Sequence, residues 1–543
     1  MQLNPIVLIV ALFSLLSCQP ESGKQIFFDK ALENGELANE GYRRCNAYVH
    51  AWLDYADAAT GLIPENLNEG IDRWTPKNSA ADNYPFMVLV SALTDSGLFR
   101  GRMAHILEAE MALTSRVGQL PDSYSFSKKG FVNEEADMEA IIFGASEYVK
   151  DGLLPLTEYL GPSPWSERMI AITDDVWAHA LVQTEFGAIP SDNVEVNGEQ
   201  LQVLSRLYWM TGEHKYLDWA IRLGDYYLLG EDHPTRDFES LRLNDHGCEI
   251  VSGLCELYAS VHFAMPAKKE EYREAVHEML DRILEIGRNE HGLFYVSVNP
   301  KTGEILEESV RDNWGYNFNG YYTVYLLDGE EKYRDALLLA FSHLENYRNY
   351  NWESGSADGF ADAIEGGLNL YMREPLTDVA EWLDSETRVM WSLQDSSYRT
   401  HALKWQNQGI IEGWHGDGNF ARTTIMYCLW KSQGTTLHPW REDLLAGAVS
   451  DEHALYISLR AEREWEGRLA FDIQRSVQNM KLPMDWPRIN QFPEWFTLTP
   501  GKEYRVIQSN TGRSSIYKAE DLDRGLNIKL SPGKLLQIEV SEL

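Results

Sequence analysis

Apolar residues recur at helical spacing through most of the chain, and this period changes only near the end. Val276, Leu280, Ile283 and Leu284, for example, lie on one face of a helix. Another apolar stretch of helical length precedes each helix of this kind, as at 321–327. The pattern predicts consecutive pairs of helices, that is, helical hairpins.

A short motif opens three of the amphipathic helices. Tyr216, Tyr272 and Tyr333 occupy matching positions near Lys and Glu residues, 56 and 61 residues apart. A repeat of about 60 residues holds one hairpin, so the stretch 41–431 has room for about six. Repeats bury their faces against neighbours, and the long connections favour a closed ring over an open solenoid of the same period. We therefore expect a mainly α fold, an (α/α)6 toroid over residues 41–445 with loops that build a cleft at one end.

The last part of the chain alternates apolar and polar residues with a period of two. Segments such as 453–459, 526–530 and 535–540 are typical of strands and are separated by turns that contain proline and glycine. No low-complexity linker precedes them. We expect a small β-sandwich at 446–543 that packs rigidly on the toroid.

The N-terminus resembles an export signal. The apolar run 6–16 has the length of a signal-peptide core and is too short to span a bilayer. It ends in Leu-Leu-Ser-Cys at Cys18, the pattern of a bacterial lipoprotein signal, although no Lys or Arg precedes the run. We expect a signal at 1–18 up to the lipidated Cys18, a tether at 19–40 and a location at the cell envelope. An ordinary secretory signal is the alternative.

The sequence shows no metal or cofactor motif. It lacks an HExxH pair, an EF-hand loop and a glycine-rich phosphate loop. The remaining cysteines form no CxxC pair, and the two that are seven residues apart would lie about 10 Å apart on a helix, too far for a disulfide. We expect no metal and no cofactor, and buried, unpaired thiols at Cys45, Cys248, Cys255 and Cys428.

The chain is strongly acidic, with 83 Asp and Glu against 48 Lys and Arg and a net charge of −35. Such a surface repels polyanions, which makes nucleic acid and an anionic membrane surface poor partners. An acidic small ligand can bind only where Arg, His and Asn gather locally. Membrane contact is therefore expected through the lipid anchor alone, and the oligomeric state stays open.

Four connections between helices concentrate polar and aromatic residues with glycine. Each ends where an apolar helix begins, so its polar groups lie at a helix N-terminus, where free N–H groups favour anions. One such loop alone is equally well explained by capping and turn formation, whereas four in one toroid favour a shared site. The four polar loops are 78–85, 242–249, 311–320 and 414–422.

An export signal, a toroid of helical hairpins and a C-terminal β-sandwich together resemble the six-hairpin glycosidase-like and polysaccharide-lyase enzymes. Within that group, the segment 482–496 (LPMDWPRINQFPEWF) and the polar loops are similar to the oligosaccharide dehydratases of ulvan-degradation gene clusters. The resemblance implies loss of water from a non-reducing-end glucuronic or iduronic acid linked to sulfated rhamnose, which gives an unsaturated uronic acid. The implied partner is an acidic oligosaccharide.

Elimination from a uronic acid sets the residue types that the site needs. A base removes the proton at C5, a cation or amide donors neutralise the neighbouring carboxylate, and an acid protonates the departing oxygen. A neutral imidazole at His246 or His415 suits the base. Tyr316 suits the acid, or the base if a nearby cation lowers its pKa. Which of these three candidate catalytic residues is the base stays open.

Substrate binding falls to the other polar and aromatic residues of the same loops. Two arginines can hold a carboxylate or sulfate through paired hydrogen bonds, and they are equally suited to pairing with acidic neighbours. Asn side chains add neutral donors, and Trp faces can stack on a sugar ring, although most Trp in a chain with 17 of them belong to the core. The predicted binding residues are Asn83, Arg311, Trp314, Asn317, Trp414, Asn419 and Arg422.

Hydrolysis is the competing prediction. Glycoside hydrolysis commonly uses two carboxylates, and a short segment at Asp174 resembles a loop of hydrolases that act on unsaturated uronides. A third alternative is a surface glycan-binding lipoprotein, which needs exposed aromatic platforms and no acid–base pair. The carboxylates available for hydrolysis are Asp82, Asp245, Asp417 and Glu365.

Overall fold

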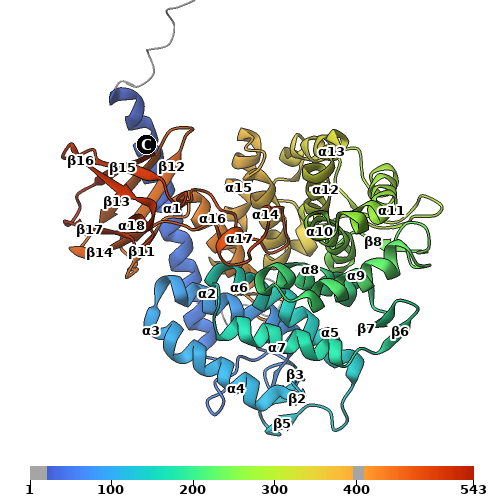
Figure 1. Cartoon of the computed structure of the whole chain (residues 1–543). Helices are drawn as coiled ribbons and strands as arrows, with labels where there is room; N and C mark the ends of the chain where they lie inside the picture. Colours follow the sequence, from blue (N-terminus) through green and yellow to red (C-terminus); the bar gives the residue numbers. More distant parts are fainter. Residues whose placement is uncertain (1–20, 396–408) are drawn as a thin grey trace, which may run out of the picture.

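The computed structural model describes residues 21–395 and 409–543, without the side chains of residues 21, 22, 246 and 395. A ring of helices makes up the larger part, and a smaller part built of β-sheets lies beside it (Figure 1). The lipidation predicted at Cys18 falls outside the described residues.

Inner helices form a closed ring in the described part of the chain. Each packs against the next in chain order, and α16 packs against α2, so the ring has no free edge. Most of their residues are buried, as expected for helices with neighbours on all sides. The inner helices are α2 (Tyr84–Thr94), α5 (Met138–Glu147) continued by η3 (Tyr148–Leu153), α8 (Val194–Thr211), α10 (Glu249–Ala264), α12 (Trp314–Asp328), α14 (Ala357–Tyr371) and α16 (Asn419–Ser432).

An outer segment packs against each inner helix. The predicted six hairpins are present as consecutive pairs, from the one that begins with α2 to the pair of α14 and α15. The last inner helix, α16, pairs instead with α1, which adds a seventh pair and closes the ring. The outer helices are α4 (Ala104–Thr114), α7 (Pro164–Ala178), α9 (His214–Leu228), α11 (Pro266–Ile286), α13 (Glu331–Phe341), α15 (Thr377–Asp395) and α1 (Glu21–Leu53).

Short elements occupy the connections of the ring. Several of them precede inner helices, so they contribute to the end of the ring where those helices begin. The helical turns are η1 (Pro76–Asn83), α3 (Ser96–Leu98), η2 (Phe99–Met103), α6 (Leu154–Leu160), η4 (Asp245–Cys248), η5 (Leu344–Tyr347) and η6 (Trp352–Gly355). The strands are β1 (Arg73–Trp74), β2 (Ser115–Val117), β3 (Leu120–Pro121), β4 (Tyr124–Ser125), β5 (Gly130–Phe131), β6 (Val182–Thr184), β7 (Gly187–Ile189), β8 (Leu241–Arg242), β9 (Tyr295–Asn299) and β10 (Glu304–Val310).

The repeated Tyr motif joins neighbouring outer helices. Tyr272 on α11 donates its hydroxyl hydrogen to Asp225 on α9 over 2.7 Å, and Lys268 forms a salt bridge with the same carboxylate over 3.2 Å. The repeat is therefore a packing device of the outer layer. The two other copies make the same contacts, Tyr216 and Lys215 with Asp174, and Tyr333 and Lys332 with Asp281.

The predicted tether at 19–40 is wrong from residue 21 onward, because that stretch is the first half of α1. This half packs against strands β12 and β13, and the second half packs against α16. The side-chain amide of Asn34 donates to the carbonyl of Ala448 over 3.0 Å, and Phe28 packs edge-on against Tyr456. One continuous helix thus holds the ring and the β part together.

The C-terminal strands form two antiparallel sheets, ordered β12-β13-β18-β15-β16 and β11-β14-β17. Apolar residues from both sheets belong to one buried cluster, which includes Ile457 and Ile528. The alternating pattern therefore located the strands, although this part begins at β11 and not at residue 446. The strands are β11 (Thr436–His438), β12 (Leu444–Ser450), β13 (Leu455–Ala461), β14 (Trp465–Ala470), β15 (Glu503–Gln508), β16 (Arg513–Lys518), β17 (Leu526–Leu530) and β18 (Leu536–Glu542), with the short helix α18 (Ala519–Leu522).

The segment 472–495 leaves the sheets and packs against the ring, which corrects its assignment to the β part. It contains one helical turn, α17 (Arg475–Gln478), and little other regular structure. Met480, Trp486 and Phe492 belong to the core cluster of the helices. We call this segment the plug.

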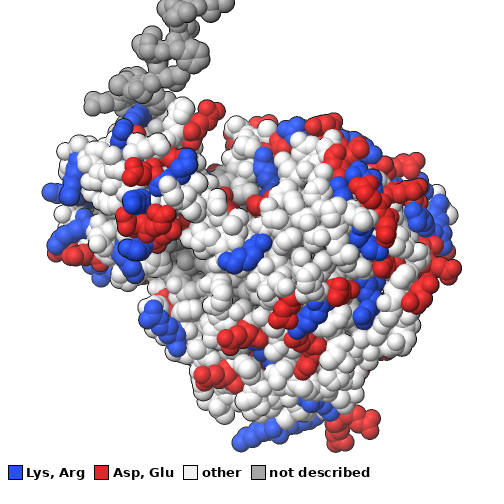
Figure 2. All heavy atoms as spheres, in the orientation of Figure 1, with Lys and Arg blue, Asp and Glu red and all other residues white. Residues whose placement is uncertain are grey.

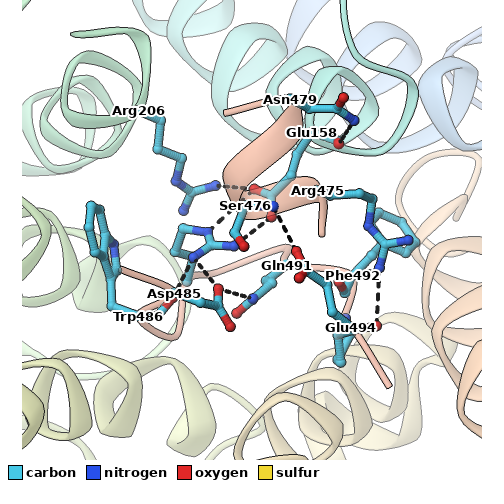
Figure 3. A network of polar contacts seen from close by, with 12 residues as sticks. Glu158, Arg206, Arg475, Ser476, Asn479, Asp485, Trp486, Gln491, Phe492 and Glu494 are labelled. Carbon is cyan, nitrogen blue, oxygen red and sulfur yellow. Dashed lines mark hydrogen bonds and ion pairs between the residues drawn. The ribbon is translucent and has the colours of Figure 1, made fainter. Parts of the chain in front are cut away.

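Buried ion pairs fix the plug (Figure 3). Arg488 pairs with Glu158 of α6 over 2.6 Å, and both side chains are almost fully buried. The carbonyl of Ile489 accepts a hydrogen bond from Arg206 of α8, and the carbonyl of Arg488 accepts one from Asn369 of α14. The plug is therefore bonded to helices on several sides of the ring.

The four cysteines of the described chain are buried and free, as predicted. In the described ranges, no helix combines the length and the apolar character that crossing a membrane requires. Acidic and basic side chains are interspersed over the face shown in Figure 2.

Candidate functional site

Hydrogen bonds and close packing link the four polar loops at the ring end where α2, α10, α12 and α16 begin. The backbone N–H of Asp245 donates to the side-chain oxygen of Asn313 over 2.6 Å, which joins the second loop to the third. A Cβ atom added at Gly418 would lie 2.2 Å from the carbonyl oxygen of Asp82, so only glycine lets the fourth loop pack against the first. The structure therefore brings together loops that are far apart in the sequence.

Arg422 is the centre of a buried ion network and is not free to bind a substrate, contrary to the prediction. It lies 2.6 Å from Asp362 and 3.1 Å from Glu365, and its side chain is 3% exposed. It also donates to the side-chain oxygens of Asn419 and Asn490 over 3.0 and 2.7 Å. Two carboxylates neutralise this guanidinium, so Arg422 holds its partners together. We call Arg422 and these partners, Asp362, Glu365, Asn419 and Asn490, the floor of the site.

Tyr316 reaches the same network. Its hydroxyl donates to Glu365 over 2.5 Å, and the side chain is buried. Burial raises the pKa of this phenol well above its usual value; the nearby Arg422 guanidinium opposes the shift and does not reverse it. The predicted role as a base with a lowered pKa is therefore wrong, and Tyr316 is a neutral donor to Glu365.

His415 is a cation at neutral pH, which contradicts its predicted role as a neutral base. Its Nε2 atom lies 3.6 Å from the carboxylate of Asp82, and Nδ1 lies 3.0 Å from the carbonyl of Gly416. Burial alone would lower its pKa, but the carboxylates of Asp82, Asp358 and Asp417 outweigh burial and raise the pKa to about 9. The imidazolium therefore balances charge within an acidic cluster.

The acidic cluster around His415 consists of Asp82, Glu353, Asp358 and Asp417. Burial and the Asp358 carboxylate raise the pKa of Glu353 to about 7, against an opposing hydrogen bond from Ser356. Burial and Asp358 also raise the pKa of Asp417 well above its usual range. The amide of Asn419 holds Asp358 in place by donating to it over 2.7 Å. The cluster thus contains a carboxyl group that holds or releases a proton near neutral pH.

Several residues in and near the acidic cluster have a strained backbone conformation. Glu353 and Ser354 have φ values of 42° and 62°, and Asp245 and Asn490 have 49° and 61°. Residues other than glycine adopt this left-handed conformation at a cost of about 1–3 kcal/mol each, and such residues concentrate at functional sites. The strain lies in η6, in the second loop and at the tip of the plug.

Several predicted binding residues have structural roles instead. Trp314 is 1% exposed and packs against Trp382 in the core. Asn317 is buried and donates to the carbonyl of Leu243, and Asn83 is buried and accepts from the hydroxyl of Tyr48. Inner helices are surrounded on all sides, so side chains at their starts and in their first turns pack against neighbouring elements.

The other predicted residues lie nearer the surface. Trp414 is 86% exposed, beside His415 in the fourth loop, and its stacking on a sugar ring stays a prediction. Arg311 lies 3.6 Å from Glu307 in a partly exposed pair. The side chain of His246 falls outside the described residues. Asp174 lies on the outer helix α7 and is bonded to Lys215 and Tyr216 of α9, so it takes part in the packing of the outer layer.

Glu353, Asp358 and Asn490 belong to the candidate site and were not among the residues predicted from the sequence. The first two lie in the connection 351–362, where Trp352, Glu353, the Ser354-Gly355 pair and Asp358 follow one another closely and could have marked a fifth polar loop. Asn490 lies in the plug, and the residues next to it in the sequence give no sign of a contact with Arg422.

No family model matches the chain, and no curated protein matches it. Among solved structures, a family 76 glycoside hydrolase (mannosidase) from Bacteroides thetaiotaomicron aligns with 72% of this chain and 99% of its own, at 13% identity and a TM-score of 0.39. The cellobiose 2-epimerase of Spirochaeta thermophila aligns with 52% of this chain and 84% of its own, at 14% identity and a TM-score of 0.37. An unsaturated glucuronyl hydrolase from Bacillus sp. GL1 aligns with 54% and 86%, at 10% identity and a TM-score of 0.36. Scores this low assign neither the fold nor the function of this chain.

Proposed function

We propose that this protein is an enzyme that acts on oligosaccharides, and that it hydrolyses a glycosidic bond with Glu353 as proton donor and Asp358 as the second carboxylate. The observation that carries the proposal is the raised pKa of Glu353, about 7, beside Asp358 in a strained turn at the end of the ring. Glycoside hydrolysis commonly uses a carboxyl group that holds a proton as the acid and a second carboxylate near it.

The charges of the site favour hydrolysis over elimination from a uronic acid. Elimination needs a cation that is free to neutralise the substrate carboxylate, and Arg422 is already paired with Asp362 and Glu365. It also needs a base, and His415 carries a proton at neutral pH. Hydrolysis needs neither a free guanidinium nor a neutral imidazole.

Dehydration of a uronic acid remains the second candidate, because one observation favours it. The His415 imidazolium lies beside the exposed Trp414, so a stacked uronic acid could direct its carboxylate to that cation. A carboxylate of the acidic cluster would then have to serve as the base at C5. The resemblance of 482–496 to ulvan oligosaccharide dehydratases agrees with this candidate.

Product analysis separates the two reactions. The purified chain is incubated with neutral oligosaccharides and with uronic-acid oligosaccharides, and the products are examined by mass spectrometry and ultraviolet absorbance. Hydrolysis gives two shorter fragments without an unsaturated product, and this is the result we expect. One intact oligosaccharide lighter by a water, with a gain in absorbance, would replace hydrolysis by dehydration. Binding without any product would favour a glycan-binding protein.

We also propose that Cys18 carries a lipid that anchors the protein to the cell envelope. The Leu-Leu-Ser-Cys sequence after an apolar run supports this proposal. In cells that process lipoproteins, Cys18→Ala should move the protein from the membrane fraction to the soluble fraction, while Cys45→Ala should leave it at the membrane. Membrane association that persists in Cys18→Ala would contradict the anchor.

A further inference from the structure

Three acidic side chains converge behind the floor of the candidate site. They are Glu147 at the end of α5, Asp151 one turn later in η3, and Glu199 of α8. One carboxylate oxygen from each lies within 4.8 Å of those of the other two. Like charges at this separation repel each other unless something neutralises them.

Glu199 lacks the partner that other buried carboxylates of this chain have. Its side chain is 0% exposed, and neither of its oxygens has a hydrogen-bond donor among the described residues. By contrast, the buried carboxylate of Glu110 is bonded to Arg168, and that of Glu256 to Arg206. A buried carboxylate without a donor is costly, so Glu199 needs a proton or a cation.

Lys150 does not donate a hydrogen bond to Glu199. Its Nζ atom is bonded to Asp151 over 2.7 Å and to Glu249 over 2.5 Å. The Lys150 bond uses Oδ1 of Asp151, and Oδ2 is buried without a hydrogen-bond partner among the described residues. Two buried carboxylate oxygens of Glu199 and one of Asp151 therefore remain without donors in one small cluster.

We propose that Glu147, Asp151 and Glu199 bind a divalent cation, with Ca²⁺ as the preferred ion. Carboxylate oxygens are the ligands of hard cations, and the cluster contains no Cys or His to favour Zn²⁺. Ca²⁺–oxygen distances of about 2.3–2.6 Å allow two ligands to lie about 5 Å apart on opposite sides of the ion. The 4.8 Å spacing fits within that span.

The cation would stabilise the floor of the site through Asn490. The side-chain amide of Asn490 donates to Asp151 over 3.1 Å, its backbone N–H donates to Glu365 over 2.6 Å, and its side-chain oxygen accepts from Arg422. A bound ion that fixes Asp151 therefore also fixes the tip of the plug. This inference concerns binding of an ion and does not depend on which reaction the site catalyses.

Calorimetry tests the proposal on the whole chain without substrate. The protein is treated with a chelator, transferred to metal-free buffer and titrated with CaCl₂, MgCl₂ or ZnCl₂. We expect one saturable Ca²⁺ site and an affinity for Ca²⁺ at least tenfold lower in Glu199→Gln, because a neutral amide replaces a ligand. Glu308→Gln, an exposed acidic position on β10, is the matched control and should bind Ca²⁺ like the wild type.

Each outcome of these titrations supports or overturns the proposed Ca²⁺ site. Absence of Ca²⁺ binding to the wild type, or unchanged binding in Glu199→Gln, would overturn the proposal, and Glu199 would then be neutralised by a proton. Tighter binding of Zn²⁺ than of Ca²⁺ would overturn the choice of a hard cation. If circular dichroism shows that Glu199→Gln does not fold, Asp151→Asn takes its place, with the same expected loss. A thermal midpoint of the wild type that Ca²⁺ raises and a chelator lowers again would support the proposal.

Discussion

Replacing Glu353 by Gln should lower kcat/KM for the cleaved oligosaccharide by about 10²–10⁴-fold, the usual contribution of a general acid or base. Gln has nearly the same shape, so the fold should persist while the exchangeable proton is lost. Asp358→Asn should cost a similar factor, because it removes the second carboxylate. Glu345→Gln, on the neighbouring turn η5 and exposed, should leave the activity unchanged. Initial rates of fragment release, measured by chromatography, provide the comparison.

The pH dependence of activity and of stability should follow the titration of Glu353. The pKa of Glu353 is about 7 in the folded protein, so the proton donor is lost and activity should fall as the pH rises above about 7. Stability should change in the same direction. In the unfolded chain, Glu353 has the ordinary glutamate pKa of about 4.3. Between about pH 4.3 and pH 7 the unfolded chain therefore releases the Glu353 proton more readily than the folded protein does. The free energy of unfolding should decrease as the pH rises through this range.

Two sets of variants test whether Glu353 is the proton donor. If hydrolysis occurs, Asp82→Asn or Asp417→Asn should reduce activity through the acidic cluster, whereas His246→Ala should leave it near the wild-type level. If Glu353→Gln stays active while His415→Ala or Tyr316→Phe abolishes activity, the proposed proton donor is wrong. The dehydration candidate would then take its place.

Replacing Arg488 by Met should destabilise the protein by about 3–5 kcal/mol, because it leaves the buried carboxylate of Glu158 without its main partner. Arg488 lies 2.6 Å from Glu158 and 2.8 Å from Asp485, and it links the plug to α6. The midpoint of thermal unfolding measures the loss. Since the plug carries Asn490, activity should fall as well.

A second substitution and a surface control make this test specific. Changing Glu158 to Gln in the Arg488→Met background should recover much of the lost stability, because no unpaired buried charge then remains. Lys529→Met breaks an exposed pair with Glu464 and should change stability by no more than about 0.5 kcal/mol. An Arg488→Met protein as stable as Lys529→Met would show that the plug is not held by this ion pair.

The pattern of apolar residues predicted the helices and strands because the period is a local property. Residues three and four apart share a helix face whatever the rest of the chain does, and the alternation at 453–459 needs only neighbouring residues. The repeat at Tyr216, Tyr272 and Tyr333 was visible for the same reason. The structural role of the repeat was not visible in the sequence, because the partner of Tyr272 is Asp225, which lies in another hairpin.

The sequence predicted which loops meet more successfully than which side chains are free. Glycine-flanked polar segments before apolar helices are local signals, and the structure joins all four of them. Which side chain is free depends on distant partners. Arg422 is occupied by Asp362 and Glu365, 60 and 57 positions away, and Trp314 faces Trp382 in the core.

Local patterns of residues predicted a ring of helical hairpins followed by strands, four polar loops at helix N-termini and buried free thiols. Only the folded chain reveals that α1 closes the ring, that the plug enters it and that His415 is charged. The reason is the range of the interactions. Periodicity and turn formation act over a few residues, whereas burial and charge depend on groups that only folding brings together, such as Asp82, Asp358 and Asp417 around His415.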